Sequence, residues 1–261
     1  MARQSIRSGG TKQRLLEAAE LLFIEYGFDA MSLRQITMEA GANLAAVNYH
    51  FGTKEALVHE LLSSRLDRLN EERLQLLSDC EQRSEGRPLD VSLVLSVLFV
   101  PGLRLTRNNV GGPTFMRLLG RVYSDPSPFI RDYLVDHYKP IYGRFFEAFA
   151  RALPQVPRHE LGMRLQFSLK ALSGMLASEN IDELVSAICI GEEISDTLML
   201  ARLIAFISPV LTTPFGQTQE ITSVKHVMDL ADAAAAVVDA RTQTRAGSRH
   251  GSRKPNSGLT S

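Results

Sequence analysis

Cysteines and long apolar runs are scarce in this sequence, and each scarcity excludes a class of protein. The two cysteines, Cys80 and Cys189, do not form a C-x-x-C pair, so we expect neither a disulfide framework nor a zinc knuckle, and a reducing cytoplasm fits. The longest apolar stretch is interrupted by Asp196, Arg202 and Pro209, which favours a core helix over a membrane span. The first residues carry no apolar segment of a secretory signal, so we expect a cytoplasmic protein without membrane contact.

Catalytic motifs are also absent from the sequence. It contains no H-E-x-x-H, no G-x-S-x-G and no glycine-rich phosphate loop. The histidines at positions 50, 59, 137 and 159 do not have the spacing of a metal site or of an acid-base pair. We therefore expect no enzyme, no metal and no cofactor.

The formal net charge of +0 conceals a basic-acidic-basic arrangement along the chain. Residues 1–14 carry four basic and no acidic residues, and residues 241–261 carry five basic and no acidic ones. Removing these nine from the 29 basic residues leaves 20 against 29 acidic residues in the middle. Basic ends suit a polyanion such as nucleic acid. The alternative is that such ends are disordered and aid solubility.

Hydrophobic residues recur at three- and four-residue steps almost throughout, and alternation with period two is nearly missing, so the sequence predicts an all-α protein. Turn compositions separate the later segments, and residues 179–217 are predicted to be an additional helical excursion. The predicted helices beyond residue 84 cover residues 89–107 with a bend before Pro101, 113–123, 128–152, 158–178 and 219–240.

The N-terminal part has the organisation of a helix-turn-helix unit. A helix from Thr11 is predicted to end at Gly27, and Ser32 with Gln35 forms a capping box that opens a second, short helix ending at Gly41. Asn43 is predicted to cap a third helix, and Thr53 to cap a long helix over 54–83. Two short helices joined by a glycine-containing turn, with a supporting helix on either side, form this unit.

The third of these helices has an unusual outward face. On a helical wheel Val47 and Phe51 point inward, whereas Ala45, Asn48 and Tyr49 point outward, with residues 44 and 50 at the margins. Asparagine can pair with adenine edges, small apolar groups contact thymine methyls, and Tyr or His can reach phosphates. We expect the DNA-binding residues to be Ser32, Arg34, Asn43, Leu44, Ala45, Asn48, Tyr49, His50, Thr53 and Lys54. The alternative for Asn48 and His50 is an ordinary exposed or packed side chain.

The run from Thr11 to Leu57 resembles the N-terminal domain of the tetracycline-repressor (TetR) family. The resemblance lies in A…LF…G of the first helix, S-L-R-x-I, the A-G turn, Y-x-F and K-E-x-L. It implies a homodimeric transcriptional regulator, usually a repressor, that binds a palindromic operator in double-stranded DNA and releases it when a small molecule binds the C-terminal domain. Asn43-Leu44 departs from the polar pair common at that position in the family, so guanine recognition by Arg or Lys is not expected from this helix.

Two motifs are similar to a subgroup of bacterial fatty-acid-responsive repressors: N-L-A-A-V-N-Y-H-F-G-x-K-x-A-L and F-M-R-L-L-G, at 115–120. This similarity implies a small hydrophobic ligand, such as a long-chain fatty acid or acyl-CoA. An apolar stripe with an i, i+4 arginine pair beside it could hold an acyl chain and its acidic head. The expected ligand-binding residues are Phe115, Arg117, Leu118, Leu119, Arg121 and Val122. The alternative is ordinary core with arginines paired to Asp125 or Asp132.

The predicted organisation is therefore a basic arm over 1–10, a DNA-binding domain over 11–57, a ligand-binding and dimerisation domain over 58–240, and a basic disordered tail over 241–261. By analogy with the family, the helices at 158–178 and 219–240 are the expected dimer surface. Two other functions stay open: a drug-responsive repressor of an efflux system, and a non-specific structural DNA-binding protein.

Overall fold

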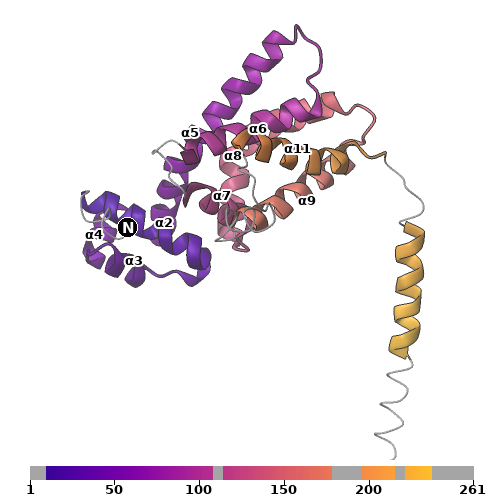
Figure 1. The fold of residues 1–261 in the computed structure, drawn as a ribbon. Coiled ribbons are helices and arrows are strands. Elements are labelled where there is room, and N and C mark those ends of the chain that lie inside the picture. Colours follow the sequence, from indigo (N-terminus) through magenta and orange to yellow (C-terminus); the bar gives the residue numbers. More distant parts are fainter. Residues whose placement is uncertain (1–9, 108–113, 178–194, 215–220, 237–261) are drawn as a thin grey trace, which may run out of the picture. The chain divides into compact units, whose positions relative to one another are not determined.

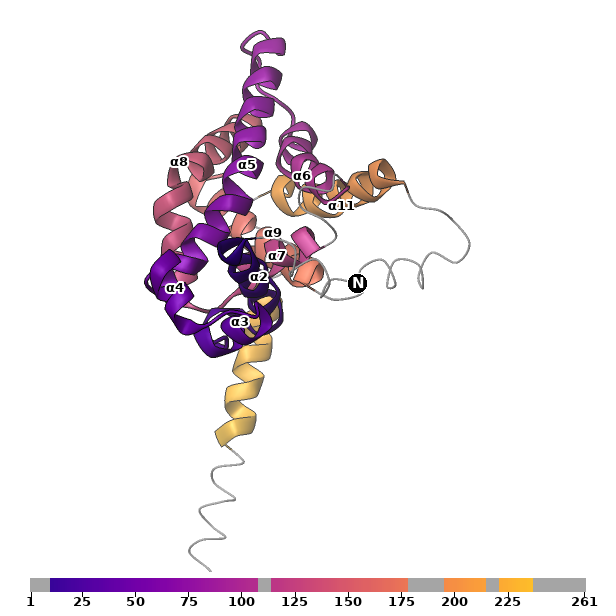
Figure 2. The same cartoon turned by 90° about the vertical axis from the view of Figure 1, so that its left-hand side faces the viewer.

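The computed structural model describes residues 10–107, 114–177, 195–214 and 221–236, and every regular element in these ranges is an α-helix. The predicted all-α class is thereby confirmed. The chain divides into two compact units, Met1–Thr213 and Pro214–Ser261. In the first unit the three N-terminal helices lie at one end and the later helices make up the rest (Figures 1 and 2).

The first helix, α2 (Thr11–Ala30), extends three residues past its predicted end at Gly27. Gly27 has φ 79° and ψ 178°, a kink across which the helix resumes. The stop residue was therefore placed correctly, but the short turn that follows was missed because it is too short to show a hydrophobic period. The buried face of α2 includes Leu15, Ala18, Ala19 and Phe23, which recur at the expected helical spacing.

The next two helices are fixed by their caps. In α3 (Leu33–Glu39) the Ser32 hydroxyl accepts from the backbone N–H of Gln35, and the Gln35 side chain accepts from that of Ser32, which confirms the capping box. In α4 (Leu44–His50) the Asn43 side chain accepts from the Ala46 N–H at 2.9 Å. Gly41 in the connecting turn has φ 56°, a conformation that favours glycine.

The longer helices follow the predicted ranges closely. Thr53 caps α5 (Lys54–Arg83), whose start and end agree with the prediction. It is followed by α6 (Val91–Arg107), which contains Pro101, and by α7 (Thr114–Ser124). The last helices of the first unit are α8 (Pro128–Ala152), α9 (Arg158–Ala177) and α11 (Asp196–Thr212). The predicted excursion over 179–217 is therefore helical over Asp196–Thr212, and most of the remainder lies outside the described residues.

Buried apolar side chains form two separate clusters. The first joins α2, α3, α4 and the first half of α5 to α7 and to the first half of α8, and it includes Phe23, Val47, Leu69, Leu118 and Tyr138. The second joins the later part of α5 to α6, α8, α9 and α11, and it includes Leu77, Leu95, Phe149, Leu161 and Leu211. The first cluster is thus continuous from α2, α3 and α4 into α7 and α8, and the boundary between the two clusters crosses α5 and α8.

The second unit contains a helix over residues 221–236, all of whose side chains are exposed. Ile221, Val224, Val227, Met228 and Leu230 are its large apolar residues. This helix is the described part of the predicted 219–240 helix, and its role as a dimer surface stays a prediction. The predicted arm and tail, apart from Gly10, lie outside the described residues. No helix among the described residues is long and apolar enough to span a membrane.

Candidate functional site

The outward face of α4 consists of the residues that the helical wheel places there. Val47 is completely buried, whereas Ala45, Asn48 and Tyr49 are exposed, Tyr49 to 85%. Leu44 is exposed to 47%. An aromatic side chain that projects almost entirely into solvent gains little hydrophobic stabilisation for the fold, so this face is available for a partner.

His50 lies at the margin of this face and is half-buried. Its ring centroid lies 5.0 Å from that of Tyr49 and 6.1 Å from that of Phe51. Phe51 packs against the first core cluster, and the Lys12 ammonium lies 5.7 Å from its ring centroid. Lys12 also pairs with Glu60 of α5 at 2.6 Å. The C-terminal end of α4 is therefore held against both supporting helices.

The three capping residues contribute to the proposed interface chiefly by placing helix starts. The oxygens of Ser32, Asn43 and Thr53 each accept a backbone hydrogen bond within their own helix, at 3.3, 2.9 and 3.1 Å respectively. All three residues are exposed. Backbone N–H groups in the first turn of a helix point outward and attract anions, so these starts suit phosphate oxygens.

The two cations expected at the interface have different surroundings. Arg34 on α3 is exposed, with its guanidinium available to solvent. Lys54 is half-buried; its ammonium donates to the Met31 carbonyl at 2.8 Å and lies 4.3 Å from the centroid of the Phe28 ring. Lys54 thus joins the start of α5 to the end of α2, a structural contact that sequence reasoning did not foresee. An ammonium has three donors, so two remain for phosphate.

An exposed apolar residue one helical turn after Arg34 was missed by the sequence reasoning. Met38 on α3 is 77% exposed. Ile36 and Thr37 are buried, and Met38 lies on the opposite side of α3. The helical period of α3 is the signal in the sequence that could have identified Met38 as exposed.

The apolar stripe predicted as a ligand wall lies on α7 and is fully part of the core. Phe115, Leu118, Leu119 and Val122 are all buried in the first cluster, and Arg117 beside them is half-buried. The expected role of these residues in ligand binding is neither supported nor excluded by their burial, because a binding wall and an ordinary core are both buried.

Arg121 bridges α7 to the end of the first helix. Its Nε donates to the Ile24 carbonyl and its Nη2 to the Glu25 carbonyl, both at 2.9 Å. Asp125, one turn later, is buried and accepts from the backbone N–H of Phe28 at 3.1 Å. The two side chains therefore hold the kink at Gly27 from both sides. Arg121 thus binds backbone carbonyls of α2, and not a surface acid as the alternative predicted.

A polar layer crosses α5 between the two core clusters. Asn70 and Arg73 are both buried there, and the Arg73 guanidinium donates to the Leu98 carbonyl at 2.9 Å and to Asn70 Oδ1 at 3.1 Å. Tyr142 of α8 lies next to this layer, and burial, followed by interaction with Tyr123, raises the pKa of its hydroxyl. Its hydroxyl is consequently neutral in the folded protein.

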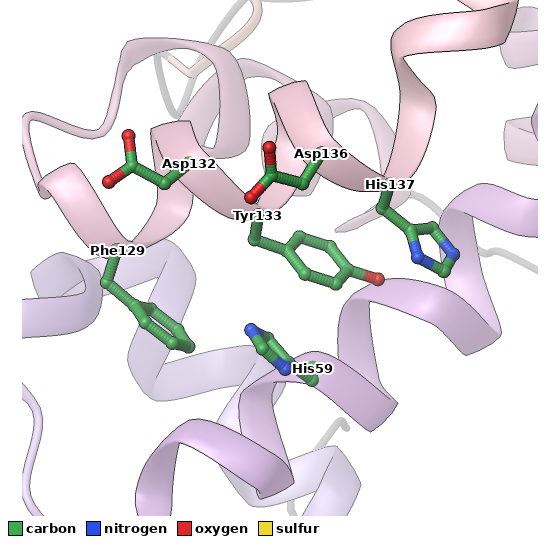
Figure 3. A pocket seen from close by; sticks show the side chains of 6 residues that line it. All are labelled: His59, Phe129, Asp132, Tyr133, Asp136 and His137. Carbon is green, nitrogen blue, oxygen red and sulfur yellow. The ribbon is translucent and has the colours of Figure 1, made fainter.

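An open hollow of about 470 Å³ lies between α5 and α8. His59 is sandwiched between Phe129 and Tyr133, with ring centroids 4.8 and 4.4 Å away, and Asp132 and Asp136 point away from it (Figure 3). Burial, and secondarily the charge of His137, lowers the pKa of His59. The described side chains contain no group of three or more His, Cys, Asp or Glu that could hold a metal ion.

Comparisons with known proteins match both halves of the chain. The model described as "Bacterial regulatory proteins, tetR family" matches residues 15–61, and the model described as "Tetracyclin repressor-like, C-terminal domain" matches residues 96–209. Among solved structures, a mutant of HlyIIR carrying a linker with two thrombin sites is 16% identical, with a TM-score of 0.46, over 81% of this chain and 99% of its own. Salmonella enterica GusR is 18% identical, with a TM-score of 0.45, over 77% and 95%.

Two curated relatives are similar over the helix-turn-helix region alone. The "HTH-type transcriptional dual regulator CecR" of Shigella flexneri is 43% identical over 53 residues, 20% of this chain and 23% of that protein. The "Probable HTH-type transcriptional regulator YttP" of Bacillus subtilis (strain 168) is 38% identical over 53 residues, 20% of this chain and 26% of that protein. The match therefore spans about a quarter of each relative. With an N-terminal and a C-terminal family model both matched, and with capped α3 and α4 in the arrangement described above, the chain belongs to the TetR family.

Proposed function

We propose that this protein is a DNA-binding transcriptional regulator that binds a palindromic operator as a homodimer. The observation that carries the proposal is the exposed face of α4, where Tyr49 and Asn48 project into solvent from a helix anchored by Val47. The two curated relatives that match this region are both named transcriptional regulators, which supports the same activity here. A helix of this kind reads base edges in the major groove, and a two-fold dimer presents two such helices to two half-sites.

The effector proposed is a small hydrophobic molecule, such as a long-chain fatty acid or acyl-CoA, whose binding releases the operator. The support for an apolar ligand is the similarity of the F-M-R-L-L-G motif, at 115–120 on α7, to the fatty-acid-responsive subgroup. A drug-responsive repressor is the second candidate. A ligand preference of about 1 to 3 kcal/mol for the non-binding state changes operator affinity roughly 5- to 150-fold.

The first experiment measures DNA binding directly. An operator is selected from random or genomic DNA with the full-length protein, and its affinity is then measured by fluorescence anisotropy. Asn48→Ala and Tyr49→Ala should each weaken specific binding by about 1 to 3 kcal/mol per half-site, with the thermal unfolding midpoint unchanged. Tyr26→Ala is the matched control, because Tyr26 is an exposed tyrosine on α2. The recognition assignment is wrong if both variants bind the selected operator as tightly as the wild type.

The second experiment identifies the class of effector. Oleate and an oleoyl thioester are titrated into the operator complex, with a short-chain acid and a cationic dye as controls. Release by oleate or its thioester supports the proposed effector, and release by the dye alone favours a drug-responsive repressor. Binding that shows no sequence preference and no response to any of these ligands would instead indicate a structural DNA-binding protein.

A further inference from the structure

The interior of the first unit contains a buried cation whose hydrogen-bond partners are uncharged. Arg73 is only 6% exposed, and its guanidinium donates to a backbone carbonyl, that of Leu98, and to the side-chain amide oxygen of Asn70. Arginine stays protonated in proteins, so a full positive charge lies in this interior. Both acceptors lie on helices that pack against one another, α5 and α6.

No nearby carboxylate balances this charge within the described part of the chain. None of the described acids lies within 4.0 Å of the Arg73 guanidinium. Two acids on the same helix have other partners: Glu72 pairs with Arg68 at 3.3 Å, and Asp67 accepts from Tyr138 at 2.8 Å. A buried charge without a counter-charge is costly, and a bound anion would remove that cost.

The surroundings of Arg73 suit the head of an amphiphile. Leu69 belongs to the first core cluster and Leu77 to the second, so Arg73 lies between two apolar regions along α5. The hydroxyl of Tyr142 interacts with the charge of Arg73 and forms a hydrogen bond with Tyr123, and its pKa is raised chiefly by burial, so it stays protonated. When it is the acceptor in the bond to Tyr123, it keeps its own O–H for an oxygen anion. A guanidinium with a hydroxyl donor beside it, between apolar regions, matches a carboxylate attached to an apolar body.

We propose that Arg73 binds the carboxylate of an apolar effector, with Tyr142 as a second donor, inside the first unit of the protein. This inference rests on the proposed function, and it names the chemical class of the effector as an organic acid with a hydrocarbon body. It moves the anchor for the acidic head from Arg117 and Arg121 on α7 to α5. Arg121 is already engaged by the carbonyls of Ile24 and Glu25.

A purely structural role for Arg73 makes a different prediction. In that case its hydrogen bond to Leu98 only joins α5 to α6, next to Pro101. Replacing Arg73 would lower the stability of the ligand-free protein and would leave the preference of the protein for an acid over a neutral analogue unchanged. The test must therefore measure that preference.

The experiment compares dodecanoate with its methyl ester, which has the same apolar chain and no charge. Dissociation constants are measured by titration calorimetry for the full-length wild type and for Arg73→Met, Arg73→Lys and Arg121→Met. Arg104→Met, which alters an exposed arginine on α6, is the matched control. Circular dichroism and the unfolding midpoint of each variant are recorded without ligand.

We expect the wild type to bind dodecanoate at least tenfold more tightly than the ester, and Arg73→Met to bind the two with equal affinity. Arg73→Lys should keep part of the preference, and it replaces Arg73→Met if that variant does not fold. Arg104→Met and Arg121→Met should keep all of it. Three results overturn the proposal: equal wild-type affinity for acid and ester, no wild-type binding of either, or a preference undiminished in both Arg73 variants. Binding to the selected operator separates a failure of this proposal from a failure of the proposed function. If the protein binds the operator specifically but gives any of these three results, only the Arg73 proposal is wrong.

Discussion

Arg121 of α7 donates a hydrogen bond from its Nε to the carbonyl of Ile24 on α2, at 2.9 Å. The two residues are 97 positions apart in the sequence. The carbonyl belongs to the last turn of α2 before the kink at Gly27, where helix carbonyls lose their intrahelical partners. A guanidinium at that place donates to these acceptors, and its positive charge interacts favourably with the negative end of the helix dipole. The link connects the DNA-binding helices to the helix on which a ligand wall is predicted.

Arg121→Met should reduce the free energy of unfolding by about 1 to 3 kcal/mol, because two charge-assisted hydrogen bonds are lost, a partly buried one to Ile24 and an exposed one to Glu25. Urea denaturation followed by circular dichroism measures this loss. Arg104→Met on the exposed side of α6 should change it by less than about 0.5 kcal/mol. Equal stability of the two variants would show that the Arg121 contacts do not hold in solution.

Gly27→Ala should destabilise the protein more than Gly41→Ala. Gly41 has φ 56°, whereas Gly27 has φ 79° and ψ 178°, a region that almost only glycine adopts, so both substitutions carry a conformational cost of about 1 to 3 kcal/mol, the larger at Gly27. A Cβ on Gly27 would also lie 2.6 Å from Asp125 Oδ2, whereas a Cβ on Gly41 would meet nothing within 4 Å. Thermal unfolding of the two variants measures the additional cost at Gly27, which combines its backbone conformation with the displacement of Asp125. Equal losses would place Asp125 away from Gly27.

Arg34→Ala and Lys54→Ala should differ in their effects on stability and resemble each other in DNA binding. Each should weaken binding to all sequences alike and reduce the slope of log K against log salt by about one unit per lost phosphate contact. Only Lys54→Ala should also lower the unfolding free energy, by about 1 to 2 kcal/mol, since its bond to Met31 and its contact with Phe28 are lost. An unchanged salt slope for Lys54→Ala would mean that Lys54 is purely structural.

The sequence predicted those features that depend on neighbouring residues. Ser32 with Gln35, Asn43, and Thr53 each cap a helix through a bond that spans three positions, so spacing alone located the helix starts. Val47 was likewise assigned to the buried side of α4 from the helical period.

Features that depend on distant residues could not be predicted in the same way. The partner of Arg121 lies 97 positions away and is a backbone carbonyl, which leaves no mark in the sequence. Arg73, in contrast, can be recognised in the sequence. It lies in the same helical stripe as Leu66, Leu69 and Leu77, and a charged residue at such an apolar position indicates a buried charge. The predicted contribution of α7 to ligand binding stays a prediction.

The first core cluster, which runs without interruption from Phe23 and Val47 to Leu118 and Tyr138, makes the DNA-binding helices poor candidates for independent transplantation. A chimera that joined residues 11–57 to another regulator would cut through the cluster and leave apolar side chains of α2 and α5 without partners. Amide hydrogens of α2 and of α7 should therefore exchange through a shared opening rather than through two separate ones. A segment transferred to another regulator would therefore have to extend from α2 through the first half of α8 to keep this cluster whole.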